Sequence, residues 1–179
     1  MPSAVDSVFD LAFWFSDRAL NDNEYLQPIK LQHLLFLTQA YYAVAYNGKR
    51  FVPAIFVADE TGPIEPSVHQ AWIEGRPSFE RVPDIPEDAK NFADSVWRRF
   101  GHHSADYLGK LCRRSPAYRV SLKRGNRAEI HLEDMIKAFT KAHDTPGVDQ
   151  VVRPKIMRSH KGRPVVVKSW TPPTVKPTQ

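Results

Sequence analysis

The sequence PIKLQHLLFLTQAYYAVAY, residues 28–46, decides the fold of this chain. Its apolar residues lie at almost every position around a helix, and a helix that is apolar on all sides is expected to be buried on all sides. Pro28 suits the first helical position, because its φ is fixed near the helical value and its missing N–H is not needed there. Asn47 and Gly48 are expected to end the helix, since both accept a positive φ. We therefore expect residues 28–46 to form the central helix of a domain.

The segments on either side of this helix carry further helix and strand patterns. Apolar spacing and capping residues predict helices, and short β-branched runs predict strands. The predicted helices cover residues 3–20 (capped by Ser3), 66–74, 86–99, 104–113 and 133–143, and the predicted strands cover 51–58 and 127–131, with 127–131 pairing with 54–58. Residues 61–63 are predicted to form a turn, and 114–126 a polar loop. The expected fold is mainly α: a compact bundle of about five to six helices around the buried central helix, with a small two-stranded β element and an irregular C-terminal tail.

Length and composition favour one globular domain followed by a tail. The 179 residues, of which 42% are hydrophobic, suffice for one hydrophobic core. The composition changes after Asp144, because six of the 15 prolines fall in residues 144–179 and helical periodicity almost disappears. We therefore expect a helical domain over residues 1–143 and a flexible or partner-ordered tail over 144–179.

Several features of the sequence predict a soluble cytoplasmic protein with no membrane partner. No apolar run approaches the length needed to cross a bilayer. The first residues include Asp6, Asp10 and Asp17 among their apolar residues, which is unlike a signal peptide. The single cysteine, Cys112, cannot form a disulfide within the chain.

The net charge of +5 lies entirely in the tail. Residues 1–143 hold 18 basic and 18 acidic residues, whereas residues 144–179 hold 7 basic and 2 acidic residues. The body is itself polarised, since residues 1–95 sum to 7 − 14 = −7 and residues 96–127 to 9 − 1 = +8. Such a charge distribution favours a macromolecular partner without identifying it.

The side chains that could support catalysis or metal binding form no recognisable motif. His102 and His103 are adjacent and therefore point apart, with no cysteine or carboxylate at the usual ligand spacing. Ser104 stands near His102 and Asp106, but catalytic triads are assembled from distant segments, so we expect Ser104 to cap a helix. Cys112 is predicted to be a buried core thiol. The chain has no glycine-rich phosphate loop. We expect no enzymatic activity, no metal site and no cofactor.

Three segments in series resemble one protein family. Residues 31–42, LQHLLFLTQAYY, are similar to the LQKLLYLAQAYYL helix of the SocA-like antitoxins, also called the Panacea domain, with His33 in place of the usual lysine. Residues 62–68, GPIEPSV, are similar to the YGPVxPxVY segment of that family, and residues 96–111 to its YGxxSxxxLSxLTH segment. The resemblance covers about residues 5–143.

The resemblance implies that the chain is a protein antitoxin that binds and neutralises a cognate toxin of the SocB type. It also implies a role as a proteolytic adaptor that delivers the toxin to ClpX of the ClpXP protease. We expect toxin contacts along residues 62–72 and at the ends of the central helix, which we expect to be exposed. The expected contact residues are Lys30, His33, Gly62, Pro63, Glu65 and Trp72. In an alternative interpretation, Gly62, Pro63 and Trp72 only form a turn packed on the core.

The tail contains a second resemblance, at Arg163, Pro164, Val165, Val166, Val167 and Lys168. This segment is similar to the RPxLRVVK peptide by which SspB-type adaptors dock on ClpX. A short β-branched stretch can add to a sheet as a strand or fill a groove. About 20 residues separate it from the last predicted helix, which gives a random-coil reach of roughly 25 Å and an effective concentration on the order of mM. Three alternatives stay open: the tail docks on a protease, wraps the toxin, or is solvated.

The basic residues also allow a different class of function. A nucleic-acid-binding regulator would use the tail and the basic stretch 96–127, and its affinity would fall steeply with salt. Of the aromatic residues in these basic segments, only Tyr118 and Trp170 are considered candidates for base stacking, so base stacking is not indicated.

Overall fold

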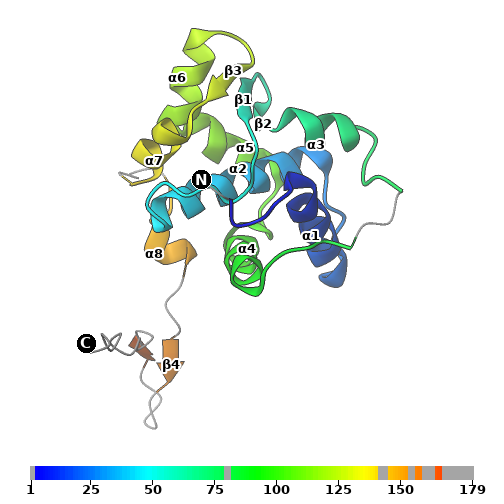
Figure 1. Cartoon of the computed structure of the whole chain (residues 1–179), viewed down its shortest axis with the longest axis vertical. Coiled ribbons are helices and arrows are strands. Elements are labelled where there is room, and N and C mark those ends of the chain that lie inside the picture. Colours follow the sequence, from blue (N-terminus) through cyan, green and yellow to red (C-terminus); the bar gives the residue numbers. More distant parts are fainter. Residues whose placement is uncertain (1–2, 79–81, 141–144, 153–155, 159–163, 167–179) are drawn as a thin grey trace, which may run out of the picture.

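The helix α2 (Pro28–Ala45) lies at the centre of the structure (Figure 1). The computed structural model describes residues 3–78, 82–140, 145–152, 156–158 and 164–166, and the statements below concern these residues. Pro28 stands at the first position of α2, and the chain leaves the helix through Asn47 and Gly48, with φ angles of 52° and 84°. The predicted central helix and both of its end signals are confirmed.

The other helices pack around α2. Those in contact with it are α1 (Val8–Asn21), α3 (Pro66–Ala71), α4 (Glu87–Phe100), α5 (Ala105–Arg114), α7 (Leu132–Thr140) and α8 (Val148–Val151), while α6 (Pro116–Arg124) packs against α5 and α7. In Figure 1, α6 and α7 lie on one side of α2, and α1 and α3 on the opposite side. The fold is mainly α with a small antiparallel sheet, as predicted. Across the described residues, no helix has both the length and the apolar character that crossing a bilayer requires.

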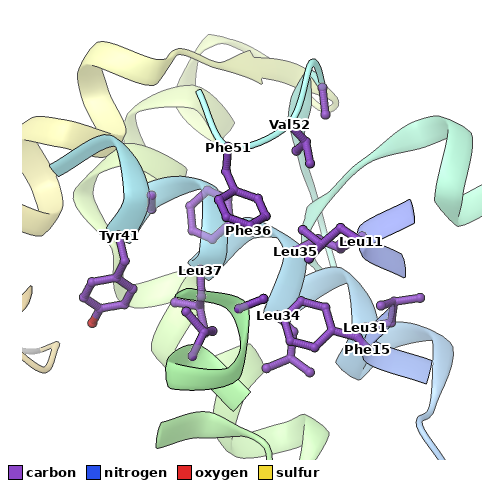
Figure 2. Packing of buried hydrophobic residues seen from close by; sticks show 14 of the residues in the cluster. Leu11, Phe15, Leu31, Leu34, Leu35, Phe36, Leu37, Tyr41, Phe51 and Val52 are labelled. Atoms are coloured by element: carbon purple, nitrogen blue, oxygen red, sulfur yellow. The ribbon is translucent and has the colours of Figure 1, made fainter. Parts of the chain in front are cut away.

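The core consists of the α2 side chains and the faces turned towards them. The fully buried apolar residues of α2 are Leu31, Leu34, Leu35, Phe36, Leu37, Ala40, Tyr41 and Ala43. Figure 2 shows Leu35 and Leu31 beside Leu11 and Phe15 of α1, and Tyr41 pointing away from them towards the other end of the helix. Because α2 buries apolar side chains around its whole circumference, it has to be covered by helices on several sides.

A three-stranded antiparallel sheet covers one end of α2. Its strands are β1 (Phe56–Asp59), β2 (Gly62–Ile64) and β3 (Ala128–Ile130), in the order β2-β1-β3. Phe56 pairs with Ile130, so the predicted pairing of the two segments is confirmed. The expectation of only two strands is wrong, because residues 62–64 form a strand and not only a turn. Pro63 is compatible with this strand because β2 lies at the edge of the sheet.

Two predicted elements begin later than the sequence suggested. α1 begins at Val8 and is capped by Ser7, not Ser3, because the backbone of residues 4–5 bonds to the carbonyl groups of residues 50–51. The strand predicted over 51–58 begins only at Phe56. The N–H groups of Phe51 and Val52 donate to the side-chain oxygen of Gln39 at 3.1 Å each, so they do not join the sheet.

The segment predicted as a polar loop contains the helix α6. Pro116 stands in its first turn, and Gly125, with φ 149°, ends it. Most of its side chains are exposed, and only Ala117, Tyr118 and Ser121 are buried. The sequence gives little indication of α6, because the helix buries few side chains and these are partly polar.

The predicted tail begins with residues that pack on the body. In α8, Val151 is buried, and the helix contacts α2 and α4. The Tyr41 hydroxyl donates to the Pro146 carbonyl at 2.7 Å. Further along, β4 (Ile156–Arg158) and β5 (Pro164–Val166) pair as an antiparallel hairpin. The tail is therefore not irregular throughout, and the body extends beyond the predicted boundary at residue 143, to about residue 152.

Candidate protein-binding surface

The residues predicted to contact a toxin are buried. The exposed fractions are 4% for Lys30, 1% for His33, 5% for Glu65 and 1% for Trp72, and Gly62 and Pro63 are buried as well. The expectation that Lys30 and His33 stand on exposed ends of α2 is therefore wrong, because β2, α4 and α5 cover this part of the helix. The burial of Gly62, Pro63 and Trp72 agrees with the alternative interpretation, in which these residues only form a turn packed on the core.

His33 is enclosed between two glycines from different elements. A Cβ atom at Gly62 of β2 would lie 2.9 Å from His33 Nε2, and one at Gly109 of α5 would lie 3.1 Å from His33 Cε1. Gly62 also has a φ of 135°, which side chains rarely adopt. Arg113 of α5 donates to the Thr61 carbonyl at 2.8 Å beside this contact. The ring of His33 therefore fixes the spacing between α2, β2 and α5.

The environment of His33 keeps its imidazole neutral. Neither ring nitrogen has a hydrogen-bond partner of ordinary geometry among the described residues. Burial lowers the pKa of His33 to about 4, and the positive charge of Arg113 adds to this effect, while the nearby backbone of Thr61 opposes it. A neutral, buried ring packed at Nε2 and Cε1 against two glycines is suited to packing, not to proton transfer with a ligand.

A second contact joins α2 to the start of α3. The side-chain oxygen of Gln32 accepts from the Glu65 N–H at 2.7 Å. The Glu65 carboxylate in turn accepts from the Val68 N–H at 2.7 Å and so caps α3. Burial raises the pKa of Glu65, although its hydrogen bonds to backbone N–H groups act in the opposite direction. We call His33, Gln32, Gly62 and Glu65 the β2–α3 joint.

Lys30 and Trp72 belong to other contacts, so the structure does not gather the predicted residues into one site. The Lys30 ammonium donates to Glu24 and to the Gly101 carbonyl, and lies 5.7 Å from the Trp97 ring centre. Trp72 packs edge-on against Phe13 of α1, with ring centres 4.9 Å apart. Both residues anchor their segments to the body.

The β2–α3 joint attaches the start of α3 to the body, and the side of α3 that faces away from the body is exposed. Pro66 and Gln70 lie on one face of α3, and Ile73, which follows the C-cap Trp72, has an exposed fraction of 62%. Tyr25, which is 67% exposed, approaches the end of this segment, since a Cβ atom at Gly75 would lie 3.1 Å from its hydroxyl. We call Pro66, Gln70, Ile73 and Tyr25 the α3 surface. Large exposed aromatic and aliphatic residues on a rigid support are typical of protein-binding surfaces.

Sequence reasoning missed the residues that define this surface and its support. Tyr25, Ile73, Gly109 and Arg113 received no role. The spacing of residues 66 and 70 could have indicated a shared helical face. The meeting of Gly109 with His33, by contrast, depends on how α5 packs on α2, for which the local sequence gives no signal.

Elsewhere in the described structure, candidate catalytic side chains take part in packing and capping contacts. No group of three or more His, Cys, Asp and Glu residues in it is placed to hold a metal ion. His103 stacks on Tyr107 with ring centres 4.3 Å apart, and Ser104 caps α5 as predicted. Cys112 is buried, and burial raises the pKa of its thiol. An open groove of about 310 Å³ between α6 and α7 is lined by Pro116, Ala117, Val120, Asp134, Lys137 and Ala138.

The residues predicted to dock on a protease lie only partly within the described structure. Pro164, Val165 and Val166 form β5, and Val165 pairs with Met157 of β4. Arg163, Val167 and Lys168 lie outside the described residues. Because β4 and β5 form a two-stranded sheet, each strand has one edge that pairs with no other described strand.

Comparisons with protein-family models, with curated proteins and with solved structures found no match to this chain.

Proposed function

We propose that this chain is a cytoplasmic antitoxin, which binds a SocB-like protein toxin through the α3 surface and delivers it to ClpXP through residues 163–168. The sequence resemblance suggests the class of partner. The proposal moves the toxin contacts from the buried residues of the β2–α3 joint to the exposed residues that the joint supports.

The observation that carries the proposal is the rigid anchoring of the α3 surface. The bonds from Gln32 to Glu65 and from Glu65 to Val68 are buried, and the His33 ring holds β2 in place. A surface that is ordered before binding loses less conformational entropy on association, so more of its contact energy contributes to affinity. Ile73 and Tyr25 supply the large apolar side chains that act as anchors in interfaces.

The strand β5 supports the adaptor part of the proposal. A β-branched strand with an unpaired edge can add to the sheet of another protein. Only ten residues, 153–162, separate the body from Arg163, which is half of the spacer expected from the sequence. Three of these residues, Ile156–Arg158, form β4, which pairs with β5. The shorter spacer holds a bound toxin closer to its docking site than the sequence suggested.

The first test uses the small open reading frame next to the gene for this chain. Its product, expressed alone, should arrest growth, and co-expression of the full chain should restore growth. The two proteins should then co-purify as a complex. If neither neighbouring product arrests growth, or if rescue occurs without a complex, the antitoxin proposal is wrong.

Two matched variants locate the binding surface. Ile73→Arg should weaken toxin binding by about tenfold or more, the loss typical of an interface anchor. Ile55→Arg is the control, because Ile55 is 54% exposed but precedes β1, outside the α3 surface. Isothermal titration of the purified full-length proteins measures both affinities. Equal losses, or no loss in either variant, would remove the α3 surface from the proposal.

The adaptor role is tested separately with a purified ClpXP assay. Val165→Asp combined with Val166→Asp should leave toxin binding unchanged and slow toxin degradation. Thr174→Asp combined with Val175→Asp places the same charges further along the tail and serves as the control. Degradation at the original rate with the first pair of substitutions would contradict docking through residues 163–168 and leave the antitoxin proposal standing.

A further inference from the structure

The helices α5 and α6 present a set of basic side chains that the proposed toxin binding does not use. Residues 105–127 contain the basic residues Lys110, Arg113, Arg114, Arg119, Lys123, Arg124 and Arg127, against a single acidic residue, Asp106. All of these basic side chains are exposed except that of Arg113, which is partly buried. Seven cations with so few acidic neighbours in sequence make this the most basic part of the described body.

Some of these cations are already engaged. Lys110 pairs with Asp106 at 2.7 Å, Arg113 donates to Thr61, Arg124 donates to the Glu129 carbonyl at 2.8 Å, and Arg127 pairs with Asp59 at 3.1 Å. Arg114, Arg119 and Lys123, by contrast, form no hydrogen bond or ion pair with any residue that the structure describes. We call Arg114, Arg119 and Lys123 the α6 surface.

The α6 surface follows one short stretch of the chain. Arg119 and Lys123 are four residues apart in α6, which places their Cβ atoms about 5–6 Å from each other on one helical face. Arg114 ends α5, and Ser115 joins the two helices as the cap of both. Three long and exposed cationic side chains, none of them paired with a residue that the structure describes, therefore stand at and beyond a single helix junction.

From this arrangement we infer that the α6 surface binds the phosphate backbone of a nucleic-acid duplex. A duplex carries one negative charge per about 1.7 Å of its axis, so unpaired cations gain by releasing its condensed counterions. Residues 1–95 sum to −7, so the rest of the body is repelled by the same polyanion, which orients the chain with α5 and α6 towards it.

The same residues indicate recognition of a backbone and not of bases. The aromatic residue of α6, Tyr118, is buried, and its hydroxyl donates to the Asp59 carbonyl at 2.5 Å. It cannot serve as a stacking platform for the unpaired bases of a single strand, and the exposed ring of Tyr107 in α5 is already stacked on His103. Binding is therefore independent of sequence and depends strongly on salt. The α6 surface is separate from the α3 surface, so this inference stands even if the chain binds no toxin.

The test measures binding of the full chain to a labelled 20-base-pair duplex of arbitrary sequence by fluorescence anisotropy, between 50 and 200 mM salt. Arg119→Glu combined with Lys123→Glu should lower the slope of log affinity against log salt by about 1.8, at about 0.9 for each phosphate contact. Raising the salt from 50 to 200 mM should then weaken binding of the variant by a factor about twelve times smaller than the factor for the original chain. Arg119→Gln combined with Lys123→Gln should show the same reduced slope without reversing charge.

The control pair is Lys49→Glu with Lys90→Glu, which changes the net charge equally but lies outside α5 and α6. These substitutions should leave the slope of the original chain nearly unchanged. Equal effects of both pairs would show attraction by net charge alone and overturn the inference, as would no binding at 50 mM salt. A polyglutamate chain of matched charge is tested in parallel. If it binds as tightly and loses affinity with the same pair, the surface recognises acidic protein, and the nucleic-acid inference is wrong.

Discussion

Replacing Gly62 with alanine should strain the β2–α3 joint for two separable reasons. The φ of 135° at this position is unfavourable for any side chain, at a cost of about 1–3 kcal/mol. The new Cβ atom would also lie 2.9 Å from His33 Nε2, whereas unstrained contacts are about 3.5–4.0 Å. Forcing the ring aside in a packed core adds about 1–3 kcal/mol. We therefore expect Gly62→Ala to reduce the free energy of unfolding by about 2–6 kcal/mol.

A double-mutant cycle separates the two causes. His33→Ala removes the ring that the new methyl group meets, so the double variant should keep the backbone cost but not the contact cost. Its loss of stability should be smaller than the sum of the two single losses by about 1–3 kcal/mol. Urea unfolding at 25 °C, followed by circular dichroism, measures all four proteins.

Gly147→Ala provides the control, because Gly147 has a φ of −62° and a Cβ atom there would meet nothing within 4 Å. Its stability should change by less than about 1 kcal/mol. If the losses from Gly62→Ala and His33→Ala add within about 0.5 kcal/mol, the two residues are not coupled. The assignment of His33 as the spacer between β2 and α5 would then be wrong.

Four further predictions concern single residues. Because burial lowers the pKa of His33 from 6.5 to about 4, the unfolded chain binds a proton between these pH values and the folded chain does not. The free energy of unfolding should therefore fall as the pH drops from about 6.5 to 4, and His33 contributes at most on the order of 3 kcal/mol to this decrease. Urea titrations of His33→Leu should lack the contribution of His33 to the decrease. Trp72→Ala should reduce stability by about 3–5 kcal/mol in the same assay, since it empties a buried site of a large ring. Tyr41→Phe should cost about 1 kcal/mol and increase amide hydrogen exchange in α8, because it removes the bond to the Pro146 carbonyl. The Cys112 thiol should resist iodoacetamide in the folded chain and react on unfolding, because burial raises its pKa and blocks access.

The elements that the sequence predicted well are those with strong local signals. The centre of the fold followed from residues 28–46 because their apolar pattern has no polar face. The cap at Ser104 and the pairing of β1 with β3 also followed from short patterns. The prediction that the strand begins at residue 51 is wrong for a non-local reason. The side chain of Gln39, twelve residues earlier, accepts the hydrogen bonds of the N–H groups that would otherwise pair with a neighbouring strand.

The expectation that Lys30 and His33 are exposed is wrong because it takes polar residues on a helix to face solvent. Lys30 is buried with a carbonyl and a carboxylate as partners, and His33 is buried because two glycines leave room for its ring. Neither condition can be read from residues 28–46, since the partners come from other segments, among them α5 and β2. Whether residues 62–72 contact a toxin stays a prediction; the structure describes a segment anchored on α2 whose residues Pro66 and Gln70 are exposed.

The hairpin of β1 and β2 contacts the elements that carry each of the two proposed binding surfaces. On one side, the His33 ring and the Gln32–Glu65 bond attach β2 and the start of α3 to α2. On the other side, Arg113 of α5 donates to Thr61, and Tyr118 of α6 donates to Asp59. Moving the hairpin would break hydrogen bonds on both sides and unpack a buried ring, and buried polar groups left without partners are costly. Occupation of the α6 surface should therefore leave the α3 surface in place, so we expect the two proposed partners, a duplex and a toxin, to bind at the same time and not in alternation.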